Sequence, residues 1–193
     1  MNDLLKVKEA LDRLKSDVGG VARWDYLVQN LPNSGFVPTS VTIMGVTIGQ
    51  PFYYVYEVSS GQDQIIVRKQ SGGYFRFGSC FGFFGISYLN DIPREITLCE
   101  GVVDWYVLRG LGYIPLACLT SGVSSYQRYL LKHLTKTLNL AFDLDRAGNK
   151  IDTRLSQELD VRILKPPVKD FGSILEDEYL KDLYLKERGW NHI

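Results

Sequence analysis

The chain has 193 residues, of which 45% are hydrophobic and 23% are charged, so it is long enough and apolar enough for one sizeable folded core. Its 22 basic and 22 acidic residues cancel, so the chain as a whole creates no positive field and any polyanion must be held by a local basic patch or by bound metal. The three cysteines, Cys80, Cys99 and Cys118, include no Cys-x-x-Cys pair, which excludes an evident zinc ribbon and favours reduced thiols in a cytoplasmic protein. No apolar run approaches the roughly 18 residues of a membrane span, so we expect no membrane association.

The first part of the chain is expected to be helical. Residues 3–18 place apolar side chains on one side at helical spacing, and Gly19-Gly20 is expected to end that helix. A second short helix is expected over residues 22–30. Core packing against a sheet is the ordinary use of such helices, and docking on a partner is the alternative.

From Val37 to Phe84 the sequence favours β-structure. The runs rich in β-branched and aromatic residues are separated by Gly, Pro and Ser turn signals, which predicts a small antiparallel meander. The expected strands are 41–48, 52–58, 65–69 and 74–77.

Three cations in this meander alternate with aromatic residues. Arg68, Lys69 and Arg76 stand close to Tyr74 and Phe75, a combination that suits single-stranded nucleic acid because cations hold phosphates and rings stack on bases. The alternative is a solvated sheet face whose aromatic residues belong to the core.

After Asp91-Ile92-Pro93 strands alternate with helices, which predicts βαβ units and a parallel sheet. The expected strands are 95–99, 114–119, 138–142 and 161–164, and the expected helices are 102–109, 124–134 and 147–159. An amphipathic helix is expected over residues 174–188.

Acidic residues follow several of these strands. Glu100 comes after the first strand with Asp104 one helical turn later, Asp143 and Asp145 come after the third, and Asp170 lies just beyond the fourth. Carboxyl ends of parallel strands meet at one edge of a sheet, so we expect these carboxylates to converge. Converging like charges raise one another's pKa, and divalent cations such as Mg²⁺ relieve that cost. For Asp143 and Asp145 alone, a turn with a helix-capping aspartate is the alternative.

Two lysines near these carboxylates are candidates for contact with a phosphate. Lys150 follows the Asp143/Asp145 pair and Lys169 directly precedes Asp170. Surface ion pairs are the alternative use of both lysines.

These motifs carry a family resemblance. Glu100-Gly101-Val102-Val103-Asp104 resembles the Glu-Gly-x-x-Asp signature of TOPRIM domains. The stretch from Asp143 to Lys150 resembles the Asp-x-Asp-x-Ala-Gly-x-Lys form of bacterial and phage DnaG-type primases, and Lys169-Asp170 is similar to the Lys-Asp after their last TOPRIM strand. Phe81 to Ile86 is similar to the aromatic-glycine linker that precedes TOPRIM in those enzymes.

The resemblance implies an α/β fold: a TOPRIM, Rossmann-like, four-stranded mainly parallel sheet flanked by helices, preceded by a small α+β subdomain with an antiparallel meander. It also implies a division of the chain into four parts. These are an N-terminal helical segment (1–35), a β-rich subdomain (36–94), the TOPRIM domain (95–176) and a C-terminal helix (177–193).

The resemblance further implies roles for the acidic residues. Asp143 and Asp145 would be the main ligands of one to three Mg²⁺ or Mn²⁺ ions, with Asp104 and Asp170 as supporting ligands and Glu100 as a ligand or general acid/base. In one respect the chain departs from the family pattern, because Gly172 and Ser173 stand where those primases commonly carry a further aspartate. The resemblance does not extend to a zinc module or a helicase domain, since the chain has no Cys/His cluster and no Gly-x-x-x-x-Gly-Lys loop.

The function implied is that of a primase core, a nucleotidyltransferase that makes short RNA primers on single-stranded DNA from nucleoside triphosphates, with a replicative helicase as a further partner. Two alternatives remain open. A TOPRIM nuclease would use the same metals to activate water against a phosphodiester. A non-catalytic module would bind single-stranded nucleic acid and use its terminal helices to dock partners.

Overall fold

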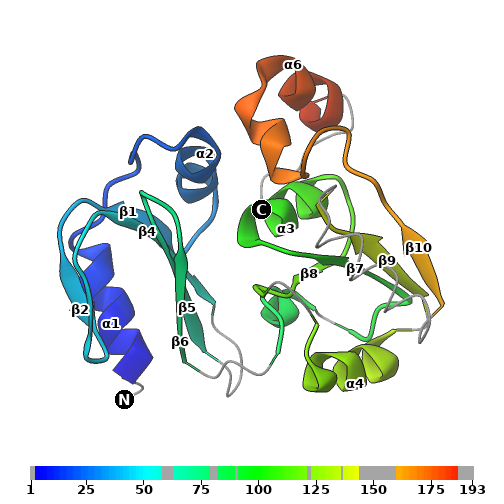
Figure 1. Ribbon diagram of the computed structural model, residues 1–193, viewed down its shortest axis with the longest axis horizontal. Coiled ribbons are helices and arrows are strands. Elements are labelled where there is room, and N and C mark those ends of the chain that lie inside the picture. The colour runs from blue at the N-terminus through cyan, green and yellow to red at the C-terminus, as the bar shows by residue number, and fades with distance from the viewer. Residues whose placement is uncertain are drawn as a thin grey trace. The chain divides into compact units, whose positions relative to one another are not determined.

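The computed structural model describes residues 3–57, 63–78, 82–89, 91–120, 123–135, 137–143 and 160–186 (Figure 1). The chain divides into two compact units, Met1–Cys80 and Phe81–His192. The finer division into four parts remains a prediction. Among the described residues, no helix has the length and apolar character needed to cross a bilayer.

The first unit is an antiparallel sheet with two helices. Its sheet has the order β1-β4-β5-β6, and β2 and β3 pair separately as a hairpin. The expected meander is therefore present as β4–β5–β6. The elements are α1 (Asp3–Asp12), α2 (Ala22–Asn30), β1 (Ser34–Val37), β2 (Val41–Ile43), β3 (Val46–Ile48), β4 (Phe52–Glu57), β5 (Gln64–Lys69) and β6 (Tyr74–Gly78).

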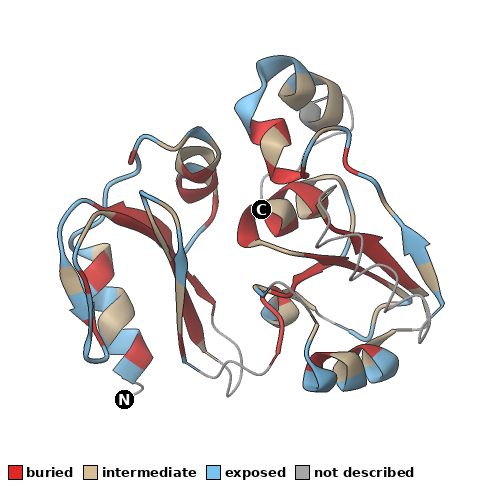
Figure 2. Ribbon diagram, in the orientation of Figure 1, coloured by how far each residue is buried: buried red, intermediate tan, exposed pale blue. Residues whose placement is uncertain are grey.

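Alternate residues of the three long strands build the core of this unit. Side chains of one parity point to one face of a sheet, and on this sheet that face packs against α1 and the hairpin. Figure 2 shows the buried strands and, on α1, separate buried patches, which correspond to Leu4 and Leu11. The buried cluster consists of Leu4, Leu11, Val37, Ile43, Ile48, Phe52, Tyr54, Tyr56, Ile65, Val67 and Phe77.

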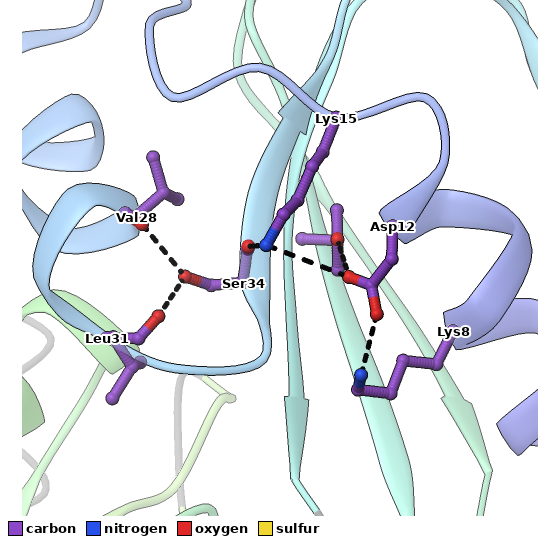
Figure 3. A network of polar contacts seen from close by, with 7 residues as sticks. Lys8, Asp12, Lys15, Val28, Leu31 and Ser34 are labelled. Carbon is purple, nitrogen blue, oxygen red and sulfur yellow. Dashed lines mark hydrogen bonds and ion pairs between the residues drawn. The ribbon is translucent and has the colours of Figure 1, made fainter.

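Polar contacts fasten the end of α1 to the sheet (Figure 3). Asp12 accepts hydrogen bonds from Lys8 Nζ at 2.6 Å and from the Tyr54 hydroxyl at 2.5 Å. Lys15 Nζ donates to the carbonyl of Ser34 at 3.2 Å. Burial of the Asp12 carboxyl opposes its ionisation, but the bonds from Lys8 and Tyr54 lower its pKa below the ordinary value.

The first helix is shorter than the sequence predicts. It ends at Asp12 instead of residue 18, because Ser16 exchanges two backbone hydrogen bonds with Phe36, at 2.7 and 2.8 Å. A residue paired with a strand cannot also continue a helix. The second helix, Ala22–Asn30, has the bounds that the sequence predicts.

Two further differences lie in the β-rich part. Residues 41–48 form a hairpin instead of one strand, since Met44 and Gly45 adopt positive φ values of 46° and 82° and reverse the chain. Strand β1 lies in a segment whose Pro-Asn-Ser-Gly sequence resembles a loop. It forms because β4 offers it a partner edge, with Ser34 opposite Val55 and Val37 opposite Phe52.

The second unit contains the predicted parallel sheet. Its strand order is β10-β9-β7-β8, and every neighbouring pair is parallel. This confirms the expected four-stranded α/β architecture. The elements are η1 (Ile86–Tyr88), β7 (Glu95–Cys99), α3 (Val102–Gly110), β8 (Pro115–Ala117), α4 (Ser125–Leu134), β9 (Thr137–Ala141), β10 (Val161–Ile163), η2 (Gly172–Glu176), α6 (Glu178–Lys181) and η3 (Asp182–Lys186).

Helices α3 and α4 lie on opposite sides of this sheet (Figure 1). The face under α4 buries one cluster of side chains, Phe83, Ile96, Leu98, Leu116, Cys118, Leu131, Leu138, Leu140 and Phe142. A capping box starts α4, because Ser124 Oγ accepts the Gln127 N–H at 3.1 Å and the Gln127 side chain accepts the Ser124 N–H at 2.9 Å. Helices α3 and α4 thus cover the two faces of the sheet and hold the ends of its strands in place.

The C-terminal helix is not continuous as predicted. The segment begins with a 3₁₀ turn, η2, and restarts as α6 after Asp177, whose backbone is extended with φ −122° and ψ 117°. The Asp177 side chain caps the new helix by accepting the Leu180 N–H at 3.1 Å. The helix expected over residues 147–159 lies outside the described residues.

Candidate metal site and nucleic-acid interface

The strand ends bring Glu100 and Asp143 to one edge of the parallel sheet. Cys99 and Ala141 are the last paired residues of β7 and β9, which are direct neighbours. Glu100 follows Cys99 immediately, and Asp143 follows Ala141 by two residues. Both acidic residues are half-buried and follow the carboxyl ends of neighbouring parallel strands, the edge at which open α/β sheets commonly bind ligands.

Asp104 lies beside them in the first turn of α3. Its Oδ2 accepts the N–H of Gly101 at 3.3 Å, and its Oδ1 accepts the N–H of Gly172 at 2.7 Å. The first of these bonds caps the helix that begins after Gly101. The second joins α3 to the segment that follows β10.

Asp170 lies in that segment and is 6% exposed. Its Oδ1 accepts two hydrogen bonds from Ser173, one from the backbone N–H at 2.6 Å and one from Oγ at 2.8 Å. These bonds fix the rotation of the carboxyl group and start the turn η2.

The carboxylates share one electrostatic environment. Burial, followed by the charge of Asp170 and then that of Asp143, raises the pKa of Asp104 to about 7. Burial also raises the pKa of the Cys99 thiol, and the charges of Asp104, Asp143 and Glu100 add to this effect. The charges of Asp143 and Asp170 therefore act on Asp104, and those of Glu100, Asp104 and Asp143 act on Cys99. That the acidic candidates form one site remains a prediction.

The donor set fits a hard divalent cation. All four groups are carboxylates, and burial together with the charges of Asp170 and Asp143 opposes the ionisation of Asp104 and raises its pKa. Mg²⁺ and Mn²⁺ prefer oxygen ligands and would remove this cost. Within the described residues, no three acidic, histidine or cysteine side chains already stand in a metal-binding arrangement. Asp145 and Lys150 lie outside the described residues, and their roles, like those of the other candidates, remain predictions.

The cations of the first unit lie on two faces of its sheet. Arg68 pairs with Tyr74 across β5 and β6, and Arg76 pairs with Ile66, so both arginines point to the face away from α1. Lys69 has the opposite parity and lies over the ring of Phe75, with Nζ 5.4 Å from its centroid. The sequence groups the three cations, whereas the register separates Lys69 from the two arginines. Lys169, in the second unit, is exposed.

Aromatic rings hold Arg68. Its guanidinium carbon lies 5.8 Å from the Trp24 ring centroid and 5.5 Å from that of Tyr74. Among the residues that the structure describes, the buried Nε and Nη1 atoms have no hydrogen-bond partner, so the rings are the recorded contacts of this guanidinium. Tyr74 is 58% exposed, which leaves much of its ring open to a stacking partner.

A buried polar chain holds Arg76. Arg76 Nε donates to Gln64 Oε1 at 2.8 Å, and Gln64 Nε2 donates to Glu57 Oε2 at 2.6 Å. Glu57 and Gln64 are directly opposite each other on β4 and β5 and are 1% and 3% exposed. The pair therefore orients the arginine from below the surface.

Three residues of this site were not predicted from the sequence. They are Cys99, whose thiol is close enough to the carboxylates to be affected by their charges, and Gly172 and Ser173, which donate hydrogen bonds to Asp104 and Asp170. Gly172 and Ser173 stood out only because an aspartate was expected there. The Asp-x-x-Ser spacing of Asp170 and Ser173 is a sequence signal for a side-chain-capped turn and would have identified one contact. No sequence signal identifies the Gly172 N–H as a donor, because every non-proline residue carries a backbone N–H group.

Comparisons with known proteins agree with this architecture. Residues 97–175 match the family model described as Toprim-like. No curated protein sequence matches the chain significantly.

Solved structures of primases share the fold. A DNA primase domain from Pseudomonas aeruginosa aligns with a TM-score of 0.68 and 19% identity, covering 91% of this chain and 74% of that one. The primase fragment of the bacteriophage T7 primase-helicase protein aligns with a TM-score of 0.58 and 19% identity over 86% and 70% of the two chains. A DnaG primase catalytic domain bound to single-stranded DNA aligns with a TM-score of 0.57 and 14% identity over 97% and 72%. At these identities the matches establish the fold.

Proposed function

We propose that this chain, whose residues 97–175 form a Toprim-like domain within the fold of DnaG-type primase cores, is a metal-dependent primase core that makes short RNA primers on single-stranded DNA. The observation that carries the proposal is the convergence of Glu100 and Asp143 at the ends of the neighbouring strands β7 and β9, beside Asp104 and Asp170. We propose a cytoplasmic location for such an enzyme, because DNA replication requires it to reach the cellular DNA.

The reaction joins two nucleotides. The 3′ hydroxyl of one attacks the α-phosphorus of the next nucleoside triphosphate, a new phosphodiester forms, and pyrophosphate leaves. Divalent ions bound at the carboxylates would neutralise charge on the triphosphate and on the leaving pyrophosphate. Asp143, Asp145 and Asp170 supply ligand oxygens in this proposal, and Glu100 accepts the proton of the attacking hydroxyl. Lys150 and Lys169 are placed at the phosphates.

The template strand is proposed to bind the first unit. Arg68, Tyr74 and Arg76 share one sheet face, so the surface offers two cations and an exposed ring. Cations that contact phosphates together with rings that stack on bases bind single strands with little sequence preference. The similar DnaG primase catalytic domain that is bound to single-stranded DNA supports single-stranded DNA as a partner, and the primase-helicase protein supports a helicase as a further partner.

A primer-synthesis assay tests the proposal. With a single-stranded template, labelled ribonucleotides and Mg²⁺ or Mn²⁺, we expect the wild-type chain to form dinucleotides and longer products. Asp143→Asn should lower the rate by more than about 100-fold, because even groups that only support a metal ligand contribute about 10- to 100-fold. The exposed Asp91→Asn is the matched control and should retain activity. Full synthesis by Asp143→Asn would refute the role of Asp143.

Omitting nucleotides distinguishes polymerisation from hydrolysis. Labelled single strands incubated with metal alone should stay intact, and cleavage that depends on Asp143 would instead identify a nuclease.

One observation favours a second candidate, a non-catalytic module that binds single strands. Asp104 and Asp170 already accept hydrogen bonds from Gly172 and Ser173, which occupies part of their capacity for metal. That module would bind single-stranded DNA, but a calorimetric titration with Mn²⁺ would show no heat of binding. Mn²⁺ binding by the wild-type chain would exclude it.

A further inference from the structure

We propose that Asp104 is a positioning residue, whose carboxylate fastens the Lys169–Asp170 segment to helix α3 and so sets the place of Asp170, instead of binding the cation itself. The inference rests on the proposed function, because the place of Asp170 matters only if the site takes a metal. It concerns the same site but changes the ligand set that the sequence resemblance implies.

Both oxygens of Asp104 bond to backbone N–H groups. Oδ2 accepts from Gly101 at 3.3 Å, within the same helix start, and Oδ1 accepts from Gly172 at 2.7 Å, 68 residues away. The shorter of the two bonds is thus the one that crosses between elements. A carboxylate that accepts an N–H from each of two segments fixes the distance between them.

Gly172 allows the close approach that this bond needs. A Cβ atom at this position would lie 2.9 Å from Val103 Cγ1 and 3.3 Å from Asp104 Oδ1. A larger residue therefore requires a shift of Val103, of Asp104 or of the segment itself, and we expect the shift to lengthen the bond between Gly172 and Asp104. The φ angle of Gly172 is not in the left-handed region, so space at this position, and not backbone conformation, requires glycine.

The bond to Gly172 acts on Asp170 through a short stretch of chain. Asp170 precedes Gly172 by two residues, and Ser173 holds its Oδ1 through two hydrogen bonds. Asp104 thus holds the backbone of the segment at Gly172, and Ser173 holds the side chain of Asp170. Weakening the hydrogen bond between Asp104 and the Gly172 N–H should therefore move the carboxyl group of Asp170 relative to Asp143 without removing any acidic group.

Asparagine at position 104 separates the two roles of this residue. Its amide oxygen can still accept the Gly172 N–H, but it carries no charge to attract a cation. If Asp104 only positions Asp170, the asparagine variant should bind the cation better than the alanine variant. If Asp104 is a charged ligand of the cation, the asparagine variant should lose affinity as well.

The test is isothermal calorimetry of the full chain with Mn²⁺ alone. Asp104→Asn should keep the Mn²⁺ dissociation constant within about 3-fold of wild type, while Asp104→Ala and Gly172→Ala should raise it about 10-fold or more, the range typical of groups that orient metal ligands. Asp143→Asn should abolish measurable binding. Gly49→Ala is the matched glycine control, because a Cβ there meets nothing within 4 Å, and it should bind like wild type.

Metal-free thermal melts accompany the titrations and identify variants that fail to fold. If Asp104→Ala does not fold, the other two variants still test the inference. Gly172→Ala keeps every carboxylate, and Asp104→Asn keeps the oxygen that accepts the Gly172 N–H. Wild-type affinity in Gly172→Ala, or loss in Asp104→Asn as large as in Asp143→Asn, would overturn this inference alone. Absence of Mn²⁺ binding by the wild-type chain would overturn the proposed function and this inference together.

Discussion

Asp104 illustrates how one side chain combines structural and electrostatic functions. Its neighbours in sequence, Glu100 and Gly101, are visible in the Glu-Gly-x-x-Asp motif, and the helix turn that brings Asp104 back to them is predictable from spacing alone. Its hydrogen bond to the Gly172 N–H is not predictable, because the donor is a backbone group far away in the chain. The sequence thus indicated where the carboxylates gather but not which of them hold the structure together.

The raised pKa of Asp104 predicts how pH changes the stability of the metal-free chain. The folded-state pKa of about 7 exceeds the unfolded value near 3.8, so between these values the folded chain binds more protons than the unfolded chain. The Asp104 contribution to the free energy of unfolding should therefore fall as pH rises from about 4 to about 7, by an amount on the order of 1.4 kcal/mol per pKa unit that separates the two states.

Urea unfolding in the presence of a chelator measures this effect. Asp104→Asn cannot ionise, so its free energy of unfolding should decline less between about pH 4 and about pH 7 than that of the wild-type chain. Parallel pH profiles for the two proteins would contradict the assignment of the raised pKa to Asp104.

At the scale of elements, hydrophobic periodicity predicted most strands and the alternation of strands with helices. Two of the failures have a common physical cause, because pairing partners distant in sequence decided the local structure of the first helix and of β1, whereas the 41–48 hairpin and the break at Asp177 have local causes. Ser16 leaves the helical pattern because Phe36 offers it hydrogen bonds, and β1 exists because β4 has an open edge. Asp177 interrupts the last helix by capping a new one.

Strand parity predicts which cations serve the nucleic-acid interface. Arg76 lies on the face that also carries Arg68 and Tyr74, and Gln64 orients it, whereas Lys69 lies on the opposite face. We therefore expect Arg76→Ala to weaken binding of single-stranded DNA and to reduce the slope of log affinity against log salt by about 0.7, the value for one lost phosphate contact on a single strand. Lys69→Ala is the control and should leave the slope unchanged.

Fluorescence anisotropy of a labelled oligonucleotide across several salt concentrations gives both slopes. Equal loss in Lys69→Ala and Arg76→Ala would show that charge alone, and not the sheet face, determines binding.

At the scale of the whole molecule, zero net charge means that the chain creates no general positive field. The first unit supplies a face with two arginines, and the second supplies carboxylates, which in the proposed function need a cation before they can hold a triphosphate. The composition predicted this dependence on local groups, and the order of strands predicted the sheet that gathers the acidic residues. The register that separates Lys69 from the arginines, and the hydrogen bonds around Asp170, required the structure.

Diffraction from crystals of the full chain grown with Mn²⁺ would test the central claim most directly, because anomalous scattering locates the ion. The account predicts a peak at about 2.1 Å from carboxylate oxygens of Asp143, at the edge of the sheet that also carries Glu100. A fully occupied Mn²⁺ bound elsewhere, with no peak at Asp143, would contradict it.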